Sequence, residues 1–472
     1  MTETAVVLST LIVFNVGLIA IGLWARRRNL DVEDFYLGGR KLGPWVAALS
    51  ASASSSSAWT LLGVSGAAYA WGLPALWLFP ATVGGFFINW AWVAPRVRRL
   101  SREEGAITLA EMVAPASLGS LRTTILRVIA AIVVFSFVFY IASQFEAAGK
   151  AFEATFGLSK QSSILVGACV VLAYTLLGGF WAVSVTDCLQ GLLMVVAAAL
   201  LPAVSLVAVG GISGLAEGLA AVGGPSIPAG QFSGVAGLLF VLAAFGITIG
   251  YPGQPHVVNR YMALRDDRAL AQGRTIALAW AVLVYAGMLT VGLCARVLFA
   301  DLGDAEQALF EAARQLLPAV LAGILLVAIL SAVMSTVDSQ LLVASSSLSH
   351  DWQRSKGAAG LAGSRLSVVA ILAAATLLAL AWRADIFSRV LFAWVAVGAA
   401  LGPVLVIRLT GRELTPRGTL AAVLAGFLST LVFAALPDTP GDFAERVIPF
   451  AIALAVALAS VRPLRMGAVT PS

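Results

Sequence analysis

The sequence predicts an all-α protein that crosses the membrane many times and is built from two related halves. Of its 472 residues, 60% are hydrophobic and only 11% are charged, which is more apolar surface than a soluble chain could bury. Two apolar segments in corresponding parts of the chain are interrupted by residues that do not suit a continuous helix in lipid. Interrupted helices in matching positions are typical of secondary transporters with inverted repeats.

Apolar windows of about 20 residues predict about thirteen membrane spans. Their approximate ranges are 4–26, 43–70, 72–95, 120–148, 161–179, 184–209, 234–255, 271–299, 316–349, 365–382, 386–408, 417–436 and 444–461. No basic residue precedes the first span and no small-residue cleavage site follows it, so we expect a retained helix and not a signal peptide. The last two spans contain few polar residues and are expected to be scaffold.

The basic residues predict the orientation of the chain. If the N-terminus lies outside, most of the 30 Lys and Arg residues fall in loops on the inner side. These inner loops include Arg26–Arg28, Arg96–Arg99, Arg260, Arg265 and Arg268. Because cytoplasmic loops are enriched in Lys and Arg, we expect the N-terminus outside and the C-terminus in the cytoplasm. The net charge of +6 thus reflects topology, and without a separate basic domain we expect no nucleic-acid binding.

The first interrupted segment runs from about Gly43 to Ala70 and contains six serines in its central part. They are Ser50, Ser52, Ser54, Ser55, Ser56 and Ser57. A hydroxyl without a partner in hydrocarbon costs about 4–8 kcal/mol, so these serines need partners other than lipid. One interpretation is close helix packing, with the hydroxyls bonded to carbonyls one turn earlier. The other is an unwound helix that offers carbonyls and hydroxyls to an ion and a solute.

The second interrupted segment favours the unwound helix. The apolar stretch that begins near residue 234 ends in Phe245–His256, which contains Pro252 and Pro255. Each proline lacks a backbone donor and clashes with the preceding turn, so a helix must break there. Two breaks in corresponding halves are stronger evidence for an ion and solute site than either one alone.

Polar side chains in two other spans mark further candidate positions. Tyr140 and Gln144 lie one turn apart and share a helix face, where they could pack between helices or line a cavity. Asp187 lies within an apolar span, where a carboxylate costs about 2.5–3.5 kcal/mol. A paired or functional Asp187 is therefore expected, and a hydrogen-bonded structural Asp near the interface is the alternative.

The span 316–349 carries a third polar stretch. Ala332, Ser335, Thr336 and Ser339 recur at spacings of three and four, which places them on one helix face, and Asp338 borders that face. A hard cation such as Na⁺ binds several oxygen atoms, and hydroxyls and freed carbonyls can supply them. A stripe of small residues for packing is the ordinary alternative, but the two broken helices favour an ion site.

Several function classes find no support in the sequence. The three cysteines, Cys169, Cys188 and Cys294, lie in apolar spans without metal-ligand spacing. The two histidines, His256 and His350, have no Cys or carboxylate cluster beside them in the sequence, so we expect neither a metalloenzyme nor another enzyme. A channel would need a continuous polar pore, whereas polarity here is concentrated at two breaks and one helix face.

Six motifs carry a family resemblance over essentially the whole chain. They are Asp34–Arg40, Trp59–Tyr69, Asn89–Arg96, Gly178–Asp187, Gly250–His256 and Met334–Val343. With them the chain resembles the sodium:solute symporter family, and most closely its sodium/proline symporter branch. The resemblance implies a five-plus-five inverted-repeat core of the LeuT type in a single transporter domain. Its expected parts are a leading helix and loop (1–42), two repeats (43–209 and 234–408) and trailing helices (416–472).

The resemblance also implies an activity and the residues that perform it. The activity is Na⁺-coupled import of a small organic solute, such as the amino acid proline, by alternating access. The main sodium site would consist of the carbonyls of Ala53, Ser56 and Ala332 and the hydroxyls of Ser335 and Thr336. A second site would combine Asp187 with Ser335, Asp338 and Ser339. The substrate cavity would be lined by Ser55, Ser57, Trp59, Gly63, Tyr140, Phe245, Ile247 and Tyr251.

The chain departs from the pattern of the proline transporters at three positions. They carry Asp where this chain has Ser55 and Trp where it has Ile247, whereas Asp338 stands where a small residue is usual. We hypothesise that Asp338 replaces the missing carboxylate, either as a sodium ligand or as a proton-binding group. A proton-coupled symporter that uses Asp187 and Asp338 is therefore one alternative.

The second alternative is a solute sensor with the same fold. Such sensors usually carry a signalling domain after the last span, and only about ten residues follow Val461. We expect a multi-pass protein of the inner (plasma) membrane whose partners are its solute and the bilayer. The sequence leaves the oligomeric state open.

Overall fold

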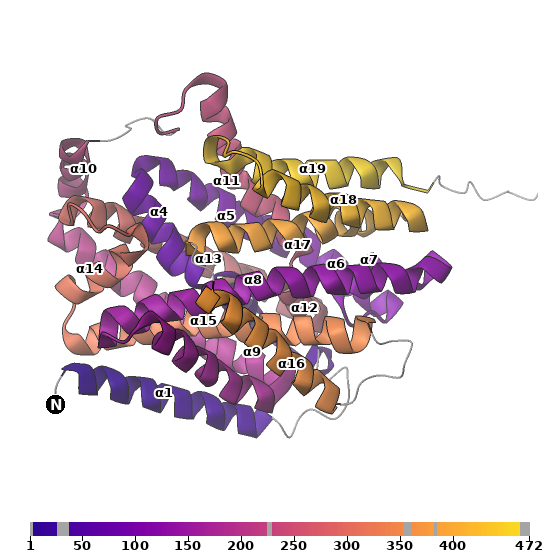
Figure 1. The fold of residues 1–472 in the computed structure, drawn as a ribbon, viewed down its shortest axis with the longest axis horizontal. Helices are drawn as coiled ribbons and strands as arrows, with labels where there is room; N and C mark the ends of the chain where they lie inside the picture. The colour runs from indigo at the N-terminus through magenta and orange to yellow at the C-terminus, as the bar shows by residue number, and fades with distance from the viewer. Residues whose placement is uncertain (1–2, 26–36, 224–228, 353–360, 382–384, 463–472) are drawn as a thin grey trace, which may run out of the picture.

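The computed structural model describes residues 3–25, 37–223, 229–352, 361–381 and 385–462. The long helices run side by side along the longest axis of the molecule (Figure 1). The short helices α10 (Gly211–Val222) and α14 (Ala308–Leu316) lie near one end of this bundle, and α6 (Ala94–Glu104) and α7 (Leu109–Val113) lie toward the other. Arg26–Arg28 and the first residues of the Asp34–Arg40 motif fall outside the described ranges.

Helix occupies every span that the sequence predicts. The helices are α1 (Glu3–Ala25), α3 (Pro44–Ser55), α4 (Val64–Trp71), α5 (Leu78–Ile88), α6, α8 (Arg122–Phe156), α9 (Lys160–Ala208), α11 (Gly234–Gly250), α12 (Pro255–Ala263), α13 (Asp267–Leu298), α15 (Ala319–Ser346), α16 (Leu361–Ala381), α17 (Ile386–Leu409), α18 (Pro416–Ala434) and α19 (Phe443–Ala459). The element α9 covers two of the expected spans. Within the described residues, eight helices are long and apolar enough to cross a membrane, so the total of thirteen crossings stays a prediction.

The centre of the bundle is formed by α15 and α17. In these two helices 78% and 89% of the apolar stretch is buried, compared with 33% in the peripheral α18. α15 contacts α3 and α8, and α17 contacts α8 and the turns at both breaks. These elements carry candidate site residues. The polar stretch of α15 therefore faces protein and not lipid.

The expected break in the first half is present. α3 ends at Ser55, Ser56 leaves the helical conformation (φ −105°, ψ 23°), and a π-helical turn, η3 (Trp59–Gly63), leads into α4. The Ala58 N–H donates to Gln144 Oε1 at 3.0 Å, and the Trp59 N–H donates to Ser57 Oγ at 3.1 Å. These side chains replace carbonyl partners that the break removes, which a buried backbone within a membrane requires.

The expected break in the second half is also present. α11 ends at Gly250, a 3₁₀ turn follows as η7 (Tyr251–Gly253), and α12 starts at Pro255. Proline suits the first position of a helix because the N–H it lacks has no partner there. Gln254 Nε2 donates to the carbonyls of Gly250 at 3.2 Å and Trp394 at 2.8 Å, which ties the break to α17.

Glycines allow the second break to approach α17 closely. Gly250 and Gly253 face Gly398 and Gly402, whose spacing of four residues is typical of close helix contacts in membranes. A Cβ at Gly398 would lie 2.8 Å from the Gly250 Cα, and a Cβ at Gly253 would lie 2.7 Å from the Gly398 carbonyl oxygen. Backbone atoms stand at both positions, so the contact cannot adapt by rotating a side chain.

We therefore expect Gly398→Ala to lower the stability of the folded protein by about 1–3 kcal/mol, the usual cost of overpacking. The measurement is thermal unfolding of the purified full-length protein in detergent. Gly84→Ala on α5 is the control, because its added Cβ would have no heavy atom within 4 Å. Equal unfolding temperatures for the two variants would contradict the close contact.

Candidate ion and substrate site

The end of α3 lies directly against the polar face of α15. The Ser335 hydroxyl donates to the Ala53 carbonyl at 3.3 Å, and the Thr336 hydroxyl donates to the Ser54 carbonyl at 3.2 Å. Ser335 Oγ also lies 3.3 Å from the Ala332 carbonyl oxygen of its own helix. All five residues are fully buried. The structure thus gathers hydroxyls of one helix and freed carbonyls of the other at one point.

The spacing of these oxygens suits a cation the size of Na⁺. Ca²⁺, whose radius is similar, binds oxygens at about 2.3–2.6 Å, so neighbouring ligands of one ion lie about 3.3–3.7 Å apart. The hydroxyl-to-carbonyl separations of 3.2 and 3.3 Å between α15 and α3 need only a slight expansion to reach that range. Ser56 lies beside these oxygens, because its N–H donates to the Ala53 carbonyl at 3.3 Å.

The donor set also favours a singly charged ion. Within the described part of the chain, no group of three or more His, Cys, Asp and Glu side chains could hold a metal. Neutral hydroxyls and carbonyls are the oxygens gathered at the break in α3. Such oxygens solvate a monovalent cation without the strong field that a divalent ion needs.

A second buried cluster surrounds Asp187 of α9. Asp187 Oδ2 accepts hydrogen bonds from Ser50 Oγ at 2.6 Å, Arg260 Nη2 at 3.0 Å and Ser339 Oγ at 3.4 Å. Arg260 Nη2 also donates to Ser339 Oγ, and the Ser339 hydroxyl lies 3.3 Å from Asp338 Oδ1. This arrangement is a buried ion pair that joins α3, α9, α12 and α15, with Asp338 at its edge.

The interpretation of Arg260 as a charge in a cytoplasmic loop is wrong. Arg260 lies on α12 with its side chain 1% exposed, and its guanidinium is held by Asp187, by Ser50 Oγ at 3.0 Å and by the His256 carbonyl at 2.7 Å. Two signals in the sequence could have identified it. Asp187 needs a buried partner, and Arg260 follows the break at Pro255 by little more than one helical turn.

Four of the expected substrate-site residues lie together beyond the break in α3. The Tyr140 hydroxyl donates to Ser57 Oγ at 3.4 Å, and Trp59 follows Ser57 by two residues. Gly63 lies against the Trp59 ring, since a Cβ there would be 3.1 Å from Trp59 Cδ1. The Trp59 indole contacts the Phe387 ring at 5.5 Å between centroids. Hydroxyls and aromatic faces therefore share one buried region, which suits a small solute with polar and apolar parts.

The second break contributes Ile247 and Tyr251 together with a residue that the sequence did not suggest. Trp394 of α17 donates from Nε1 to the Ile247 carbonyl at 3.1 Å, and its ring meets the Tyr251 ring edge-on at 4.7 Å. Trp394 therefore brings an indole to this break. Its partner lies 147 residues away, so no local pattern could have pointed to it.

Tyr285 of α13 links the two groups of residues and was also not predicted. Its hydroxyl accepts from Thr60 Oγ1 at 3.2 Å and lies 3.5 Å from Ser56 Oγ. Its ring lies 6.5 Å from the Trp59 ring and 6.2 Å from the Phe86 ring. A single tyrosine in a long apolar span was the only signal in the sequence.

Two other expected substrate-site residues make contacts outside these two groups. Phe245 lies against the Trp77 ring of η4 (Leu73–Trp77) at 6.5 Å, and no ring contact among the described residues joins it to Trp59 or Tyr140. The Ser55 hydroxyl donates to the Ser52 carbonyl of its own helix at 3.1 Å. The core of the candidate site therefore lies between Ser57, Trp59 and the second break.

A charged group near α14 holds Phe387 in place above Trp59. The Phe387 N–H donates to Glu306 Oε1 at 3.0 Å, and Lys150 Nζ lies 2.6 Å from Glu306 Oε2 and 2.7 Å from Asp304 Oδ2. Burial raises the pKa of Glu306 above its usual value, and Lys150 opposes this rise. The ion pair fixes the turn η8 (Ala305–Gln307) over the beginning of α17.

Solved structures share this fold from end to end. A Na⁺-coupled sialic acid symporter in a substrate-bound outward-open state matches 98% of this chain and 99% of its own chain, with a TM-score of 0.79 and 16% identity. A nucleobase-cation-symport-1 family transporter in a closed conformation matches 91% of this chain and 94% of its own, with a TM-score of 0.57 and 14% identity. The expected all-α core of the LeuT type is thereby confirmed.

Sequence comparison identifies the family. A sodium/proline symporter of Escherichia coli is 36% identical over 445 residues, which cover 90% of this chain and 87% of the relative. An osmoregulated proline transporter of Bacillus subtilis is 33% identical over 433 residues, which cover 89% of this chain and 87% of the relative. The model of the sodium:solute symporter family matches residues 35–426. The chain therefore belongs to the sodium:solute symporter family, a family of membrane transporters and not of enzymes.

Proposed function

We propose that the protein imports proline together with Na⁺ by alternating access. The observation that carries this proposal is the contact of Ser335 and Thr336 with the carbonyls at the end of α3. Two relatives of at least 33% identity over about nine-tenths of the chain are named as proline transporters, which supports the choice of solute. A Na⁺ that moves inward gains about 2.3 kcal/mol per 100 mV, enough to drive accumulation of a solute.

The proposed main sodium site consists of five oxygens. They are the carbonyls of Ala53, Ser56 and Ala332 and the hydroxyls of Ser335 and Thr336. An ion there bridges α3 and α15, so it stabilises the arrangement in which these helices meet. Solute affinity must then be higher in the Na⁺-bound state, and by linkage the solute raises Na⁺ affinity to the same degree.

We assign the solute to the neighbouring region around the two breaks. The proposed lining is Ser55, Ser57, Trp59, Gly63, Tyr140, Phe245, Ile247 and Tyr251, and we add Trp394 because it donates to the Ile247 carbonyl. The helix that resumes at η3 after the break in α3 directs the positive end of its dipole toward this region, which suits the carboxylate of an amino acid. The aromatic faces of Trp59 and Trp394 suit the apolar ring of proline.

The cluster of Asp187, Asp338 and Ser339 is the proposed second cation or proton site. Arg260 already neutralises Asp187 through a contact of 3.0 Å, so a second cation must displace its guanidinium from the carboxylate. Asp338 reaches the same cluster through Ser339. A carboxylate at this position supplies the negative charge that Ser55 does not supply on α3.

We expect Asp338→Asn to weaken Na⁺ activation of uptake by about tenfold, because a buried charge within a cation site contributes at least about 1.4 kcal/mol. Proline uptake is measured as a function of Na⁺ concentration at several pH values. A loss of pH dependence without a change in Na⁺ activation would assign Asp338 to proton binding. If neither quantity changed, Asp338 would not replace the missing carboxylate.

We propose the plasma membrane as the location, with the N-terminus outside. Two basic clusters that the positive-inside rule assigns to the cytoplasm lie at the same end of the bundle, which supports this orientation. Arg98 of α6 contacts Asp267 at the start of α13, and Arg102 donates to the Leu264 carbonyl at 3.0 Å. The orientation is tested with single cysteines placed on α6 and on α14, which are labelled by a reagent added from outside.

Uptake into liposomes tests the proposed function. Purified protein is reconstituted, and labelled proline is supplied with an inward Na⁺ gradient or an inward H⁺ gradient, each imposed alone. We expect accumulation with the Na⁺ gradient and competition by unlabelled proline. Accumulation driven only by H⁺ would place coupling on the carboxylates, and no accumulation of proline with either gradient would refute the choice of solute.

A further inference from the structure

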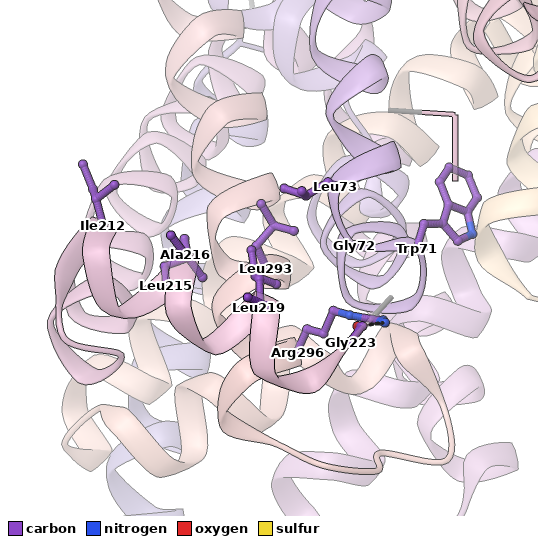
Figure 2. Close-up of a pocket in the computed structure, with 11 residues that line it drawn as sticks. Trp71, Gly72, Leu73, Ile212, Leu215, Ala216, Leu219, Gly223, Leu293 and Arg296 are labelled. Carbon is purple, nitrogen blue, oxygen red and sulfur yellow. Dashed lines mark hydrogen bonds between the residues drawn. The ribbon is translucent and has the colours of Figure 1, made fainter. Parts of the chain in front are cut away.

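A cavity of about 590 Å³ lies at the end of the bundle where α4, α10 and α13 meet (Figure 2). Its lining is mainly apolar, with Leu73, Leu215, Leu219 and Leu293 on its walls. Arg296 is the one charged residue among those that line it. The cavity is separate from the ion site, which lies where the end of α3 meets α15. The proposed function makes no use of it.

The wall contributed by α10 is an apolar surface that protein covers only in part, because Leu215 and Leu219 are half-buried against the core. Ile212, Leu215, Leu219 and Val222 follow one another at spacings of three and four and therefore share a helix face, and no residue of α10 is buried. Ile212 is 80% exposed and Val222 is 50% exposed. Glu217 is the single charged residue of this helix. The exposed apolar side chains of α10 are available for contact with an acyl chain.

Arg296 occupies the polar edge of the same cavity. Its Nη1 donates to the carbonyls of Tyr69 at 2.7 Å and Ala70 at 3.0 Å, and its Nη2 donates to the Gly223 carbonyl at 3.4 Å. No carboxylate pairs with Arg296 in the described part of the chain. Carbonyls orient the guanidinium without neutralising it, so its full charge faces the cavity. Figure 2 shows it beside Gly223, apart from the apolar side chains of α10.

The backbone around Arg296 adopts conformations that only glycine adopts readily. Gly72 has φ 70° and ψ −137°, and Gly223 has φ 72° and ψ 172°. A Cβ at Gly72 would lie 3.5 Å from Arg296 Nε. These two turns bring the chain close to the guanidinium on both sides, so the position of the charge is defined by the fold.

We infer that this cavity binds a phospholipid, whose phosphate contacts Arg296 and whose acyl chain lies along the apolar face of α10. A guanidinium is well suited to phosphate, because its planar fork donates hydrogen bonds in the geometry that phosphate oxygens accept. A volume of about 590 Å³ is within the range of specific small-molecule sites. A zwitterion such as proline fits poorly, because it would leave the leucines uncovered and bring an ammonium group to Arg296.

Native mass spectrometry of the full-length protein in detergent, titrated with phosphatidylglycerol, tests this inference. We expect one tightly retained lipid per wild-type chain. Arg296→Gln should weaken its retention by about tenfold, because a charge-assisted contact to phosphate is lost. Arg296→Lys should retain the lipid more tightly than Arg296→Gln. Arg314→Gln is the control, because Arg314 lies on α14 and pairs with Glu311 outside the cavity.

A second variant distinguishes the loss of lipid binding from misfolding of the protein. Ile212→Asn changes a residue that is 80% exposed, so the fold should tolerate it while the acyl chain loses an apolar contact. We expect several-fold weaker retention of phosphatidylglycerol. Unchanged retention in both Arg296→Gln and Ile212→Asn would overturn the inference. A second saturable proline site that disappears in Arg296→Gln would also overturn it, because the solute and not a lipid would then be the occupant.

Discussion

Thr336→Ala is expected to abolish Na⁺-dependent proline uptake at ordinary Na⁺ concentrations. The substitution removes a hydroxyl that reaches across to the Ser54 carbonyl at 3.2 Å, where the end of α3 meets α15. A lost contact to a charged species costs about 1.5–3 kcal/mol, so Na⁺ affinity should fall by about tenfold to more than a hundredfold. Ser335→Ala should have an effect of similar size. Uptake is measured in liposomes over a range of Na⁺ concentrations.

Two matched variants separate the ion site from general effects on α15. Thr336→Ser keeps the hydroxyl and should keep most of the Na⁺ dependence. Ser346→Ala removes a hydroxyl of the same helix that bonds only to the Val343 carbonyl within the described contacts, and it should leave uptake near the wild-type level. If Thr336→Ala transported like Ser346→Ala, the main sodium site would have to lie elsewhere.

Asp187→Asn is expected to destabilise the folded protein by about 3–5 kcal/mol, because it leaves the buried Arg260 charge without its partner. The side chains of Asp187 and Arg260 are 0% and 1% exposed, so water cannot compensate for the loss. Thermal unfolding in detergent measures the effect. The double variant Asp187→Asn with Arg260→Gln removes both charges and should recover much of the stability.

Proline uptake by the double variant distinguishes a structural role of the ion pair from a role in transport. If the pair only supports the fold, a stable double variant should transport proline, whereas a role in cation movement predicts a stable but inactive protein. Asp267→Asn is the control, because the Asp267 side chain in its ion pair with Arg98 is 88% exposed and its loss should cost less than about 1 kcal/mol. Equal destabilisation by Asp187→Asn and Asp267→Asn would contradict the buried ion pair.

Both helix breaks could be predicted because their causes are local. Pro252 and Pro255 cannot continue a helix in any context, and a run of serines cannot face lipid without partners. The hydroxyl face of α15 was predictable for the same reason, since Ser335 and Thr336 share a face wherever the helix lies. These features depend on residue type and on spacing along a helix, and both can be read directly from the sequence.

The partners of Asp187 and Ile247 were not predictable in this way. Arg260 precedes a cluster of basic residues in the sequence and resembles part of a cytoplasmic loop, but in the fold it contacts a buried carboxylate 73 residues earlier. Trp394 and Tyr285 lie in spans that contain no other sign of function. Each of these contacts joins helices far apart in the chain, and no spacing rule connects them.

The sequence by itself determined the membrane class, the two breaks, the polar face of α15 and the family, because composition, proline positions and motifs carry that information. Only the tertiary structure decided that Arg260 neutralises Asp187, that Trp394 joins the second break, and that carbonyls hold Arg296 beside an apolar cavity. The physical reason is that burial and charge pairing depend on which helix faces meet. Those faces meet through contacts such as Gly250 with Gly398, which exist only after α11 and α17 have packed together.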